Sequence, residues 1–408
     1  MEQAFAAYSN RNMFLASLLQ SKEIQDFISK ALSANLDSLK ISTVLAKNYS
    51  DEERRAIMDY IPLVKKSREK FNFNGFLLCD KLALEQSTAY DIGSWKSRLW
   101  PSSGKVHDLC CGMGGDSFFI PDSLEITGID MSEERLQMYA YNMQTFNKKA
   151  NTLNADVRNL KLIDPKANAD FFTIDPARRK EENENQRQFD NLTPSLQEVL
   201  ELSKNYKGGM VKLPPGFPID EIPFDAEIIY LGSRQDCREC LVLLGMLAQN
   251  PGKIRTVLLD KDSAIEFISK NDRSIVEETQ NLEISEIKRF ISEPCPLFVR
   301  SKLFTEIAKE MDAKIISQGI AYLTTEEPIL QTGFSSFEVL EFAPLGTAAV
   351  KAMLKKHGIG KLTLKKRGVE IIPEEEIKRL KPKGKNEGVL FYTRLFGEKI
   401  AILTRRVF

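Results

Sequence analysis

The sequence is poor in histidine, has no long apolar run and carries no net charge. Its 408 residues include two histidines, His107 and His357, which are too few imidazoles for a typical zinc site. No uninterrupted apolar stretch approaches the roughly 18 residues that a membrane span needs. Met1 begins a polar stretch with helical spacing and not a signal peptide. We therefore expect a cytoplasmic protein, and we expect no metal site because no ligand cluster is visible.

Cysteine is also scarce, and its placement favours structural roles. The six cysteines fit a reducing compartment better than a disulfide framework. Cys237 and Cys240 form a CxxC pair, but a zinc site would need a second pair of ligands nearby. Basic and acidic residues each total 57, so the overall charge indicates no class of partner, although its distribution does.

Length and periodicity predict three domains and one connection. The chain is 42% hydrophobic, enough for several filled cores. Residues 1–70 have apolar positions at helical spacing and predict an all-helical N-terminal domain. Residues 71–250 alternate strands with helices, and residues 251–292 are expected to connect this domain to the next. Residues 293–408 mix helices and strands and end in a hairpin, which predicts an α+β domain.

The alternating pattern after Lys105 predicts a Rossmann-like, doubly wound α/β sheet whose strands are mostly parallel. Strands are expected over residues 106–109, 125–130, 151–155, 170–175, 209–213, 227–231 and 240–247. The last two have only a short connection between them and are expected to run antiparallel. A mostly parallel sheet with one antiparallel hairpin at its end is a more specific architecture than a generic dinucleotide-binding fold.

The stretch 105–116, KVHDLCCGMGGD, carries the first signal for a ligand. A short apolar run ends in Asp108 and passes into a turn that contains Gly112, Gly114 and Gly115. Glycine lets the backbone adopt φ > 0 and lie against a bound molecule, while the amides that open the next helix point at it. The alternative is an ordinary strand-to-helix turn, and the residues downstream weigh against it.

Acidic residues end the next three strands at the same edge. Asp130 ends the second strand, about twenty residues after the turn begins, where a carboxylate can accept hydrogen bonds from ribose hydroxyls. Asp156 ends the third strand and, with the neighbouring amide of Val157, can hold an adenine amino group; a helix N-cap is its alternative role. Asp175 ends the fourth strand beside the topological switch point, and Pro176 stiffens the loop that follows.

These residues, in this order, resemble a class I methyltransferase that uses S-adenosylmethionine (SAM). Six segments resemble those of the bacterial SAM-dependent methyltransferases that carry a C-terminal THUMP-like domain: LEQS at 84–87, DLCCGMGGDS at 108–117, DPARR at 175–179, VKLPPG at 211–216, EVLEF at 338–342 and KLTLKKRGVEI at 361–371. The resemblance covers nearly the whole chain from about Lys70 onward. It implies that SAM binds at Asp108, Gly112, Gly114, Gly115, Asp116, Asp130, Asp156 and Val157.

Nicotinamide dinucleotide binding is the rival interpretation of the glycine turn. Its fingerprint requires G-x-G-x-x-G, whereas the spacing here is Gly112-x-Gly114-Gly115, and it needs no Asp-Pro after the fourth strand. SAM is therefore the favoured cofactor.

The Asp-Pro motif indicates where the acceptor binds. It is similar to the D/N-P-P-aromatic motif of enzymes that methylate exocyclic or amide nitrogens, among them the trimethylguanosine synthase family. The resemblance implies that Asp175 and Pro176 orient the acceptor, and positioning supplies most of the rate. This chain departs from the motif, because Ala177 and Arg178 replace the second proline and the aromatic residue. Arg178 can instead stack on a base or contact a phosphate, and a solvated surface turn is the alternative.

Charge gathers near the C-terminus and favours nucleic acid as the partner. Residues 351–408 contain 16 Lys and Arg against 6 Asp and Glu, with few aromatics between them, which is typical of phosphate-backbone binding. THUMP domains bind RNA, so the resemblance points the same way. We expect methylation of a base nitrogen in tRNA or rRNA, with Lys365, Lys366 and Arg367 among the RNA contacts. A solvated basic surface, a protein or small-molecule acceptor, and a non-catalytic SAM-binding module stay open as alternatives.

Overall fold

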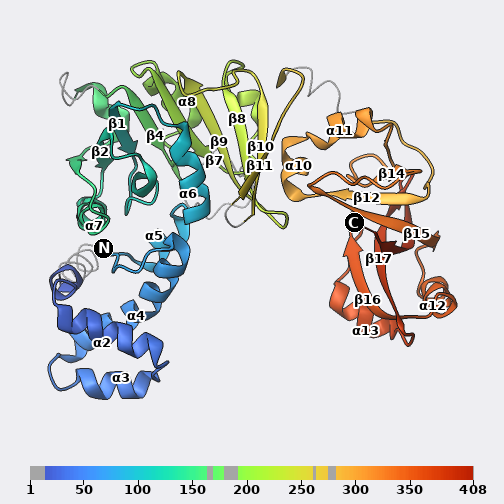
Figure 1. Ribbon diagram of the computed structural model, residues 1–408, viewed down its shortest axis with the longest axis horizontal. Helices are drawn as coiled ribbons and strands as arrows, with labels where there is room; N and C mark the ends of the chain where they lie inside the picture. The colour runs from blue at the N-terminus through green and yellow to red at the C-terminus, as the bar shows by residue number, and fades with distance from the viewer. Residues whose placement is uncertain (1–13, 163–168, 179–191, 261–262, 274–281, 408) are drawn as a thin grey trace. The chain divides into compact units, whose positions relative to one another are not determined.

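The computed structural model describes residues 14–162, 169–178, 192–260, 263–273 and 282–407 (Figure 1). The chain divides into two compact units, Met1–Leu213 with Leu241–Gln249, and Pro214–Cys240 with Asn250–Phe408. No helix in these described ranges combines the length and the apolar character that a membrane crossing requires.

The N-terminal part of the first unit is helical, as its periodicity predicts, with α2 (Lys22–Ser33), α3 (Ser38–Leu45) and α4 (Asp51–Phe71). A capping box between Ser50 and Glu53 starts α4, which satisfies amides that a helix leaves unpaired at its first turn. The fully buried Tyr60 of α4 donates a hydrogen bond to the Leu77 carbonyl at 2.8 Å. This contact joins α4 to the segment before the sheet, so these helices share one compact unit with the first strands, although a separate domain was expected.

A nine-stranded sheet has the order β11-β10-β8-β9-β7-β4-β1-β2-β3. Its strands are β1 (Gly104–Leu109), β2 (Leu124–Asp130), β3 (Ala150–Asn154), β4 (Phe171–Ile174), β7 (Gly208–Leu213), β8 (Glu227–Gly232), β9 (Cys237–Gly245), β10 (Ile254–Asp260) and β11 (Ser263–Ile268). β1 pairs in parallel with both β2 and β4, β2 with β3, and β4 with β7. The doubly wound, mostly parallel sheet is therefore confirmed.

The expected antiparallel hairpin is β8 and β9, which are neighbours in the sheet. A hydrogen bond from the Ser233 amide to the Asp236 carbonyl closes the turn between them at 3.0 Å, and neighbouring strands joined by so short a turn run antiparallel. This hairpin does not end the sheet, however, because β10 and β11 extend it.

Residues 251–292 were expected to connect two domains, but they also contain the strands β10 and β11. β10 pairs in parallel with β8 and antiparallel with β11, and six of its seven residues are buried. The apolar residues of β10 are interrupted by Arg255 and Thr256, which are themselves buried. The sequence therefore shows neither strand alternation nor a continuous apolar run at this strand.

Helices and short strands complete the first unit. They are α5 (Lys81–Gln86), α6 (Tyr90–Lys96), α7 (Glu133–Thr145), α8 (Leu196–Ser203), β5 (Ala177–Arg178) and β6 (Leu192–Thr193), with 3-10 helices η1 (Ser97–Leu99), η2 (Ser117–Phe119) and η3 (Val157–Leu162). Ser132 is the N-cap of α7, and its side chain accepts a hydrogen bond from the Arg135 amide. The helix packs on β2 and β3.

The second unit contains a seven-stranded sheet of order β13-β14-β12-β15-β18-β17-β16. Its elements are β12 (Phe290–Pro294), β13 (Lys314–Ile315), β14 (Leu323–Thr325), β15 (Phe334–Pro344), β16 (Ile359–Lys366), β17 (Asn386–Leu395) and β18 (Glu398–Arg406), with η4 (Ile219–Glu221), α10 (Pro296–Ser301), α11 (Phe304–Glu310), α12 (Thr347–Lys356) and α13 (Pro373–Leu380). β17 and β18 form the predicted C-terminal hairpin.

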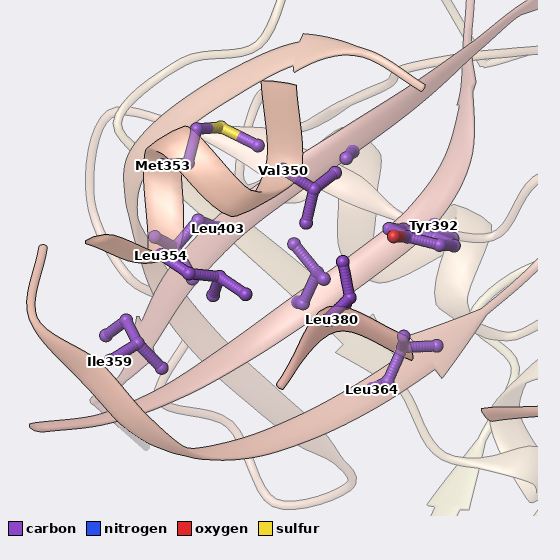
Figure 2. Packing of buried hydrophobic residues seen from close by; sticks show 10 residues of the cluster. Val350, Met353, Leu354, Ile359, Leu364, Leu380, Tyr392 and Leu403 are labelled. Carbon is purple, nitrogen blue, oxygen red and sulfur yellow. The ribbon is translucent and has the colours of Figure 1, made fainter. Parts of the chain in front are cut away.

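One face of this sheet is covered by α12 and α13. Figure 2 shows Val350, Met353 and Leu354 of α12 gathered with Leu380 of α13 and Leu403 of β18, all of them buried. Because the apolar residues of α12 recur three and four positions apart, they form one stripe along the helix. The stripe buries against the sheet, which gives the expected α+β layer.

Candidate active site

The carboxyl ends of five parallel strands bring most of the predicted site residues to one edge of the sheet. Along the order β7-β4-β1-β2-β3, β7 carries Lys212, β4 is followed by Asp175, β1 by the glycine turn 110–115, β2 ends in Asp130, and β3 is followed by Asp156. The chain leaves β1 toward β2 and returns on the other side as β4. The topological switch point, where ligands bind in such sheets, is therefore at β1 and β4, as predicted.

The three glycines of the turn have different surroundings. Gly112 has φ 54°, and a Cβ built on it would meet nothing closer than the Cys110 carbonyl at 4.0 Å. A Cβ on Gly114 would lie 2.9 Å from the Phe118 ring, and one on Gly115 would lie 2.7 Å from the Ser87 Cβ. Gly112 thus leaves open space beside the backbone, whereas Gly114 and Gly115 are required by internal packing.

Asp130 holds the turn in place. Its Oδ2 accepts a hydrogen bond from the Gly112 amide and its Oδ1 one from the Ser132 amide, each at 3.0 Å. The Cys111 amide also donates to the Ile129 carbonyl at 3.1 Å. The end of β2 therefore fixes both the conformation of the turn and the direction of the Asp130 carboxylate.

Asp108 lies under the turn and is only 4% exposed. It accepts a hydrogen bond of 2.6 Å from the Ser117 hydroxyl, which also contacts the Tyr139 hydroxyl at 2.9 Å. Burial, and then the negative charge of Asp116, raise the pKa of Asp108 to about 8. These contacts make Asp108 a support for the turn.

Asp116 takes part in a buried ion pair. Its Oδ1 accepts from the Lys96 ammonium at 2.6 Å and from the Thr88 hydroxyl at 2.9 Å. Burial alone raises the pKa of Asp116, but the charges of Lys96 and Lys212 outweigh burial and hold that pKa below its ordinary value. Asp116 thereby fastens the segment before β1 to the turn.

Asp156 and Val157 follow β3. The Asp156 carboxylate accepts from the Arg158 guanidinium, with the shortest contact at 2.6 Å, and its Oδ1 accepts from the Arg158 amide at 3.0 Å. These hydrogen bonds lower the pKa of Asp156. The contact with the Arg158 amide has the geometry of a helix N-cap, which is the alternative role that the sequence allows for Asp156. The side chain of Val157 is buried.

Asp175 and Lys212 form an ion pair, with 2.5 Å between Oδ2 and Nζ. The Asp175 side chain is 37% exposed and that of Lys212 19%, so the pair lies at the surface of the site with the lysine further inside. Pro176 is buried. Arg178 belongs to β5, which pairs with β6, while its side chain and the whole of Arg179 lie outside the described part of the structure.

Sequence reasoning missed three side chains at this edge: Thr88, Lys96 and Lys212. Lys212 Nζ lies 3.5 Å from the Thr88 hydroxyl and 3.4 Å from the Gln86 carbonyl. The segments LEQS and VKLPPG contributed only to the family resemblance. Lys212 stands near the carboxyl end of the strand next to β4, and that position was the signal that could have identified it.

The three basic residues expected to contact RNA have partners inside the second unit. Lys365 pairs with Glu293 at 2.5 Å and Arg367 pairs with the same carboxylate at 3.5 Å, while Lys366 donates to the Ile371 carbonyl at 2.5 Å. These side chains are therefore less available to a phosphate than their sequence suggests.

Other lysines of the same region are exposed, namely Lys355, Lys381, Lys383 and Lys385. The loop 381–386 packs beside the start of β16, where the Gly384 amide donates to the Ile359 carbonyl at 3.0 Å and the Asn386 amide to the Gly358 carbonyl at 2.9 Å. Because α12 ends just before Gly358, this packing brings the loop lysines to the same end of the domain as Lys355.

Comparisons with known proteins agree with this architecture. A family model described as THUMP domain-like matches residues 334–406. An uncharacterised S-adenosylmethionine-dependent methyltransferase of Mycobacterium tuberculosis strain H37Rv is 25% identical over 333 residues, which cover 80% of this chain and 87% of that protein. The crystal structure of a proposed methyltransferase from Porphyromonas gingivalis W83 has a TM-score of 0.75 and 22% identity, and covers 95% of this chain and 99% of that one.

Proposed function

We propose that the chain transfers a methyl group from SAM to a base nitrogen of RNA, in tRNA or rRNA. Its similarity to an S-adenosylmethionine-dependent methyltransferase of Mycobacterium tuberculosis and the THUMP domain-like match near its C-terminus support this proposal. The observation that carries the proposal is the edge formed by β4 and β1. There Asp175, held by Lys212, ends the strand next to the glycine turn.

The residues of the turn fit SAM. The open space beside Gly112 allows a ligand to approach the backbone closely. An ionised carboxylate has about four lone-pair sites, so Asp130 can accept from ribose hydroxyls while it keeps its two amide hydrogen bonds. Asp156 and the Val157 amide lie after the next strand, where an adenine ring would be held. Bound SAM supplies a methyl group on a positively charged sulfur.

Asp175 is the residue that orients the acceptor in this proposal. Its carboxylate accepts a hydrogen bond from the acceptor amine and directs the nitrogen lone pair toward the methyl carbon, and Pro176 keeps the loop rigid. The N–C bond forms as the C–S bond breaks, and the nitrogen then loses one proton to water. The main contribution of the protein is alignment, which is worth several orders of magnitude in rate.

RNA is favoured as the acceptor by the THUMP-like match over residues 334–406 and by the surplus of basic residues there. Lys365, Lys366 and Arg367 contact RNA in this proposal only where an RNA phosphate displaces their internal partners. The exposed side chains of Lys355, Lys381, Lys383 and Lys385 need no such exchange, and we extend the proposed contact to them.

The test is methyl transfer from radiolabelled SAM to fractionated RNA, protein and metabolites. We expect label in RNA, at a base nitrogen after digestion to nucleosides. Asp175→Ala should abolish transfer and retain SAM binding, while the control Asp122→Ala, at a site 82% exposed, should leave both unchanged. Label in protein or metabolites would assign the acceptor to those classes instead. SAM binding by the wild type without transfer to any of the three fractions would leave only a SAM-binding module.

A further inference from the structure

We infer that Lys212 is a positioning residue for the methyl-transfer step. It fixes the Asp175 carboxylate and links it to the segment Gln86–Thr88, which packs on the glycine turn. The inference rests on the proposed role of Asp175 as the residue that orients the acceptor.

The strand register explains why Lys212 reaches Asp175. β4 and β7 are parallel, with Ile174 opposite Val211, so the next residues of the two chains lie side by side at the carboxyl edge. Both strands are central in the sheet and both are buried over most of their length. Residues on rigid elements hold a geometry more closely than residues on loops, and the 2.5 Å ion pair therefore sets the direction of the Asp175 carboxylate.

The second contact of Lys212 leads to the cofactor side of the site. Its Nζ lies within 3.5 Å of both the Gln86 carbonyl and the Thr88 hydroxyl. Thr88 donates to Asp116 at the end of the glycine turn. Ser87 lies so close to Gly115 that a Cβ there would clash with it. One ammonium group thus connects the acceptor-orienting carboxylate with the segment that covers the turn.

Lys212 also lies among other ionisable groups of the site. Asp108, Asp116 and Asp175 lie close enough to influence one another, since the charges of the latter two raise the pKa of Asp108. The charge of Lys212 acts on Asp116. It also contributes, after burial, to lowering the pKa of Lys70 to about 8. The ammonium group of Lys212 therefore pairs directly with Asp175 and adds to the positive charge that Lys96 provides beside Asp116.

Lys207 provides a matched control. It pairs with Asp170 at 2.7 Å, and these two residues precede the same two strands, β7 and β4, at their opposite ends. Lys207→Met therefore removes an ion pair between the same strands without touching the site. Its side chain is 63% exposed, so the effect on stability should be small.

The experiment measures single-turnover methylation, the Kd for SAM and thermal unfolding for Lys212→Met, Lys212→Arg, Lys207→Met and Asp175→Ala. Misplacing a reacting group by about 1 Å can cost about 100-fold in rate. We expect Lys212→Met to lower the rate of transfer by about that factor, with the Kd for SAM changed by less than about threefold. Lys212→Arg should restore part of the rate, and Lys207→Met should match the wild type.

The outcomes separate the two proposals. Should Asp175→Ala methylate normally, the proposed function of that residue is overturned. Should Asp175→Ala be inactive while Lys212→Met behaves like Lys207→Met, the role of Lys212 is overturned and that of Asp175 stands. A Lys212→Met variant that loses SAM binding and stability together with activity would show a structural role and would also overturn the inference. If Lys212→Met does not fold, Lys212→Gln takes its place with the same measurements and the same criteria.

Discussion

The contrast between Gly112 and Gly115 predicts that two alanine substitutions three residues apart act in different ways. Gly112→Ala places a methyl group in open space but on a backbone with φ 54°, where an L-residue costs about 1–2 kcal/mol. Alanine also reduces the freedom of the unfolded chain by about 0.4–1 kcal/mol. The net loss in the free energy of unfolding should therefore lie between about 0 and 1.6 kcal/mol. The methyl group occupies the space proposed for SAM, so the Kd for SAM should rise at least tenfold.

Gly115→Ala should show the opposite balance. Its backbone is not left-handed, but the new Cβ would lie 2.7 Å from the Ser87 Cβ and 3.2 Å from the Thr88 amide nitrogen. Because one of these neighbours is backbone, the segment must move, and overpacking of this kind costs about 1–3 kcal/mol. We expect a larger loss of stability than for Gly112→Ala and a smaller direct effect on SAM binding.

Urea unfolding and calorimetric titration with SAM check both substitutions. Both tryptophans of the chain, Trp95 and Trp100, belong to the first unit, so their fluorescence follows the unit that carries the turn. The reasoning would be refuted if Gly112→Ala bound SAM like the wild type, or if Gly115→Ala were the more stable of the two variants.

Two further predictions concern the second unit and the buried carboxyl. Replacing Lys381, Lys383 and Lys385 together by alanine should weaken RNA binding. It should also reduce the slope of log K against log salt by about 0.7–0.9 for each RNA phosphate that the loop no longer neutralises, as filter binding over a salt series would show; an unchanged slope would exclude this loop from the interface. The pKa of Asp108 is about 8 in the folded chain, against 3.8 unperturbed. Between these two pH values the folded chain holds a proton on Asp108 that the unfolded chain has lost. The contribution of this residue therefore lowers the free energy of unfolding as pH rises from about 4 to 8. Asp108→Asn keeps the hydrogen bond from Ser117 but cannot titrate, so it should gain stability relative to the wild type as pH rises over that range. The free energy of unfolding of both proteins can be measured by urea unfolding at several pH values. A difference between the two proteins that stays the same at every pH would contradict the assignment.

The residues at the strand ends could be predicted because their signals are local. A short apolar run followed at once by glycines, or by Asp-Pro, marks the carboxyl end of a strand in a parallel sheet. For this reason the turn after β1 and Asp175 after β4 could be assigned to one edge from the sequence, and Asp130 was added because an acidic residue about twenty positions after such a turn ends the next strand. The strands β10 and β11 were not predicted, because Arg255 and Thr256 interrupt the apolar residues of β10 and because β10 pairs with β8, which is not its neighbour in the chain.

By itself, the sequence determined the alternating strands and helices, the glycine turn with its acidic companions, and the basic composition of the C-terminal region. Each of these depends on residue type and on spacing over a few positions. Tertiary structure alone decided which charges meet: Lys212 reaches Asp175, 37 residues away, and Lys365 reaches Glu293, 72 residues away. The physical reason is that an ion pair depends on distances of a few ångströms between side chains. Those distances are set by strand register and packing, to which a local pattern does not respond.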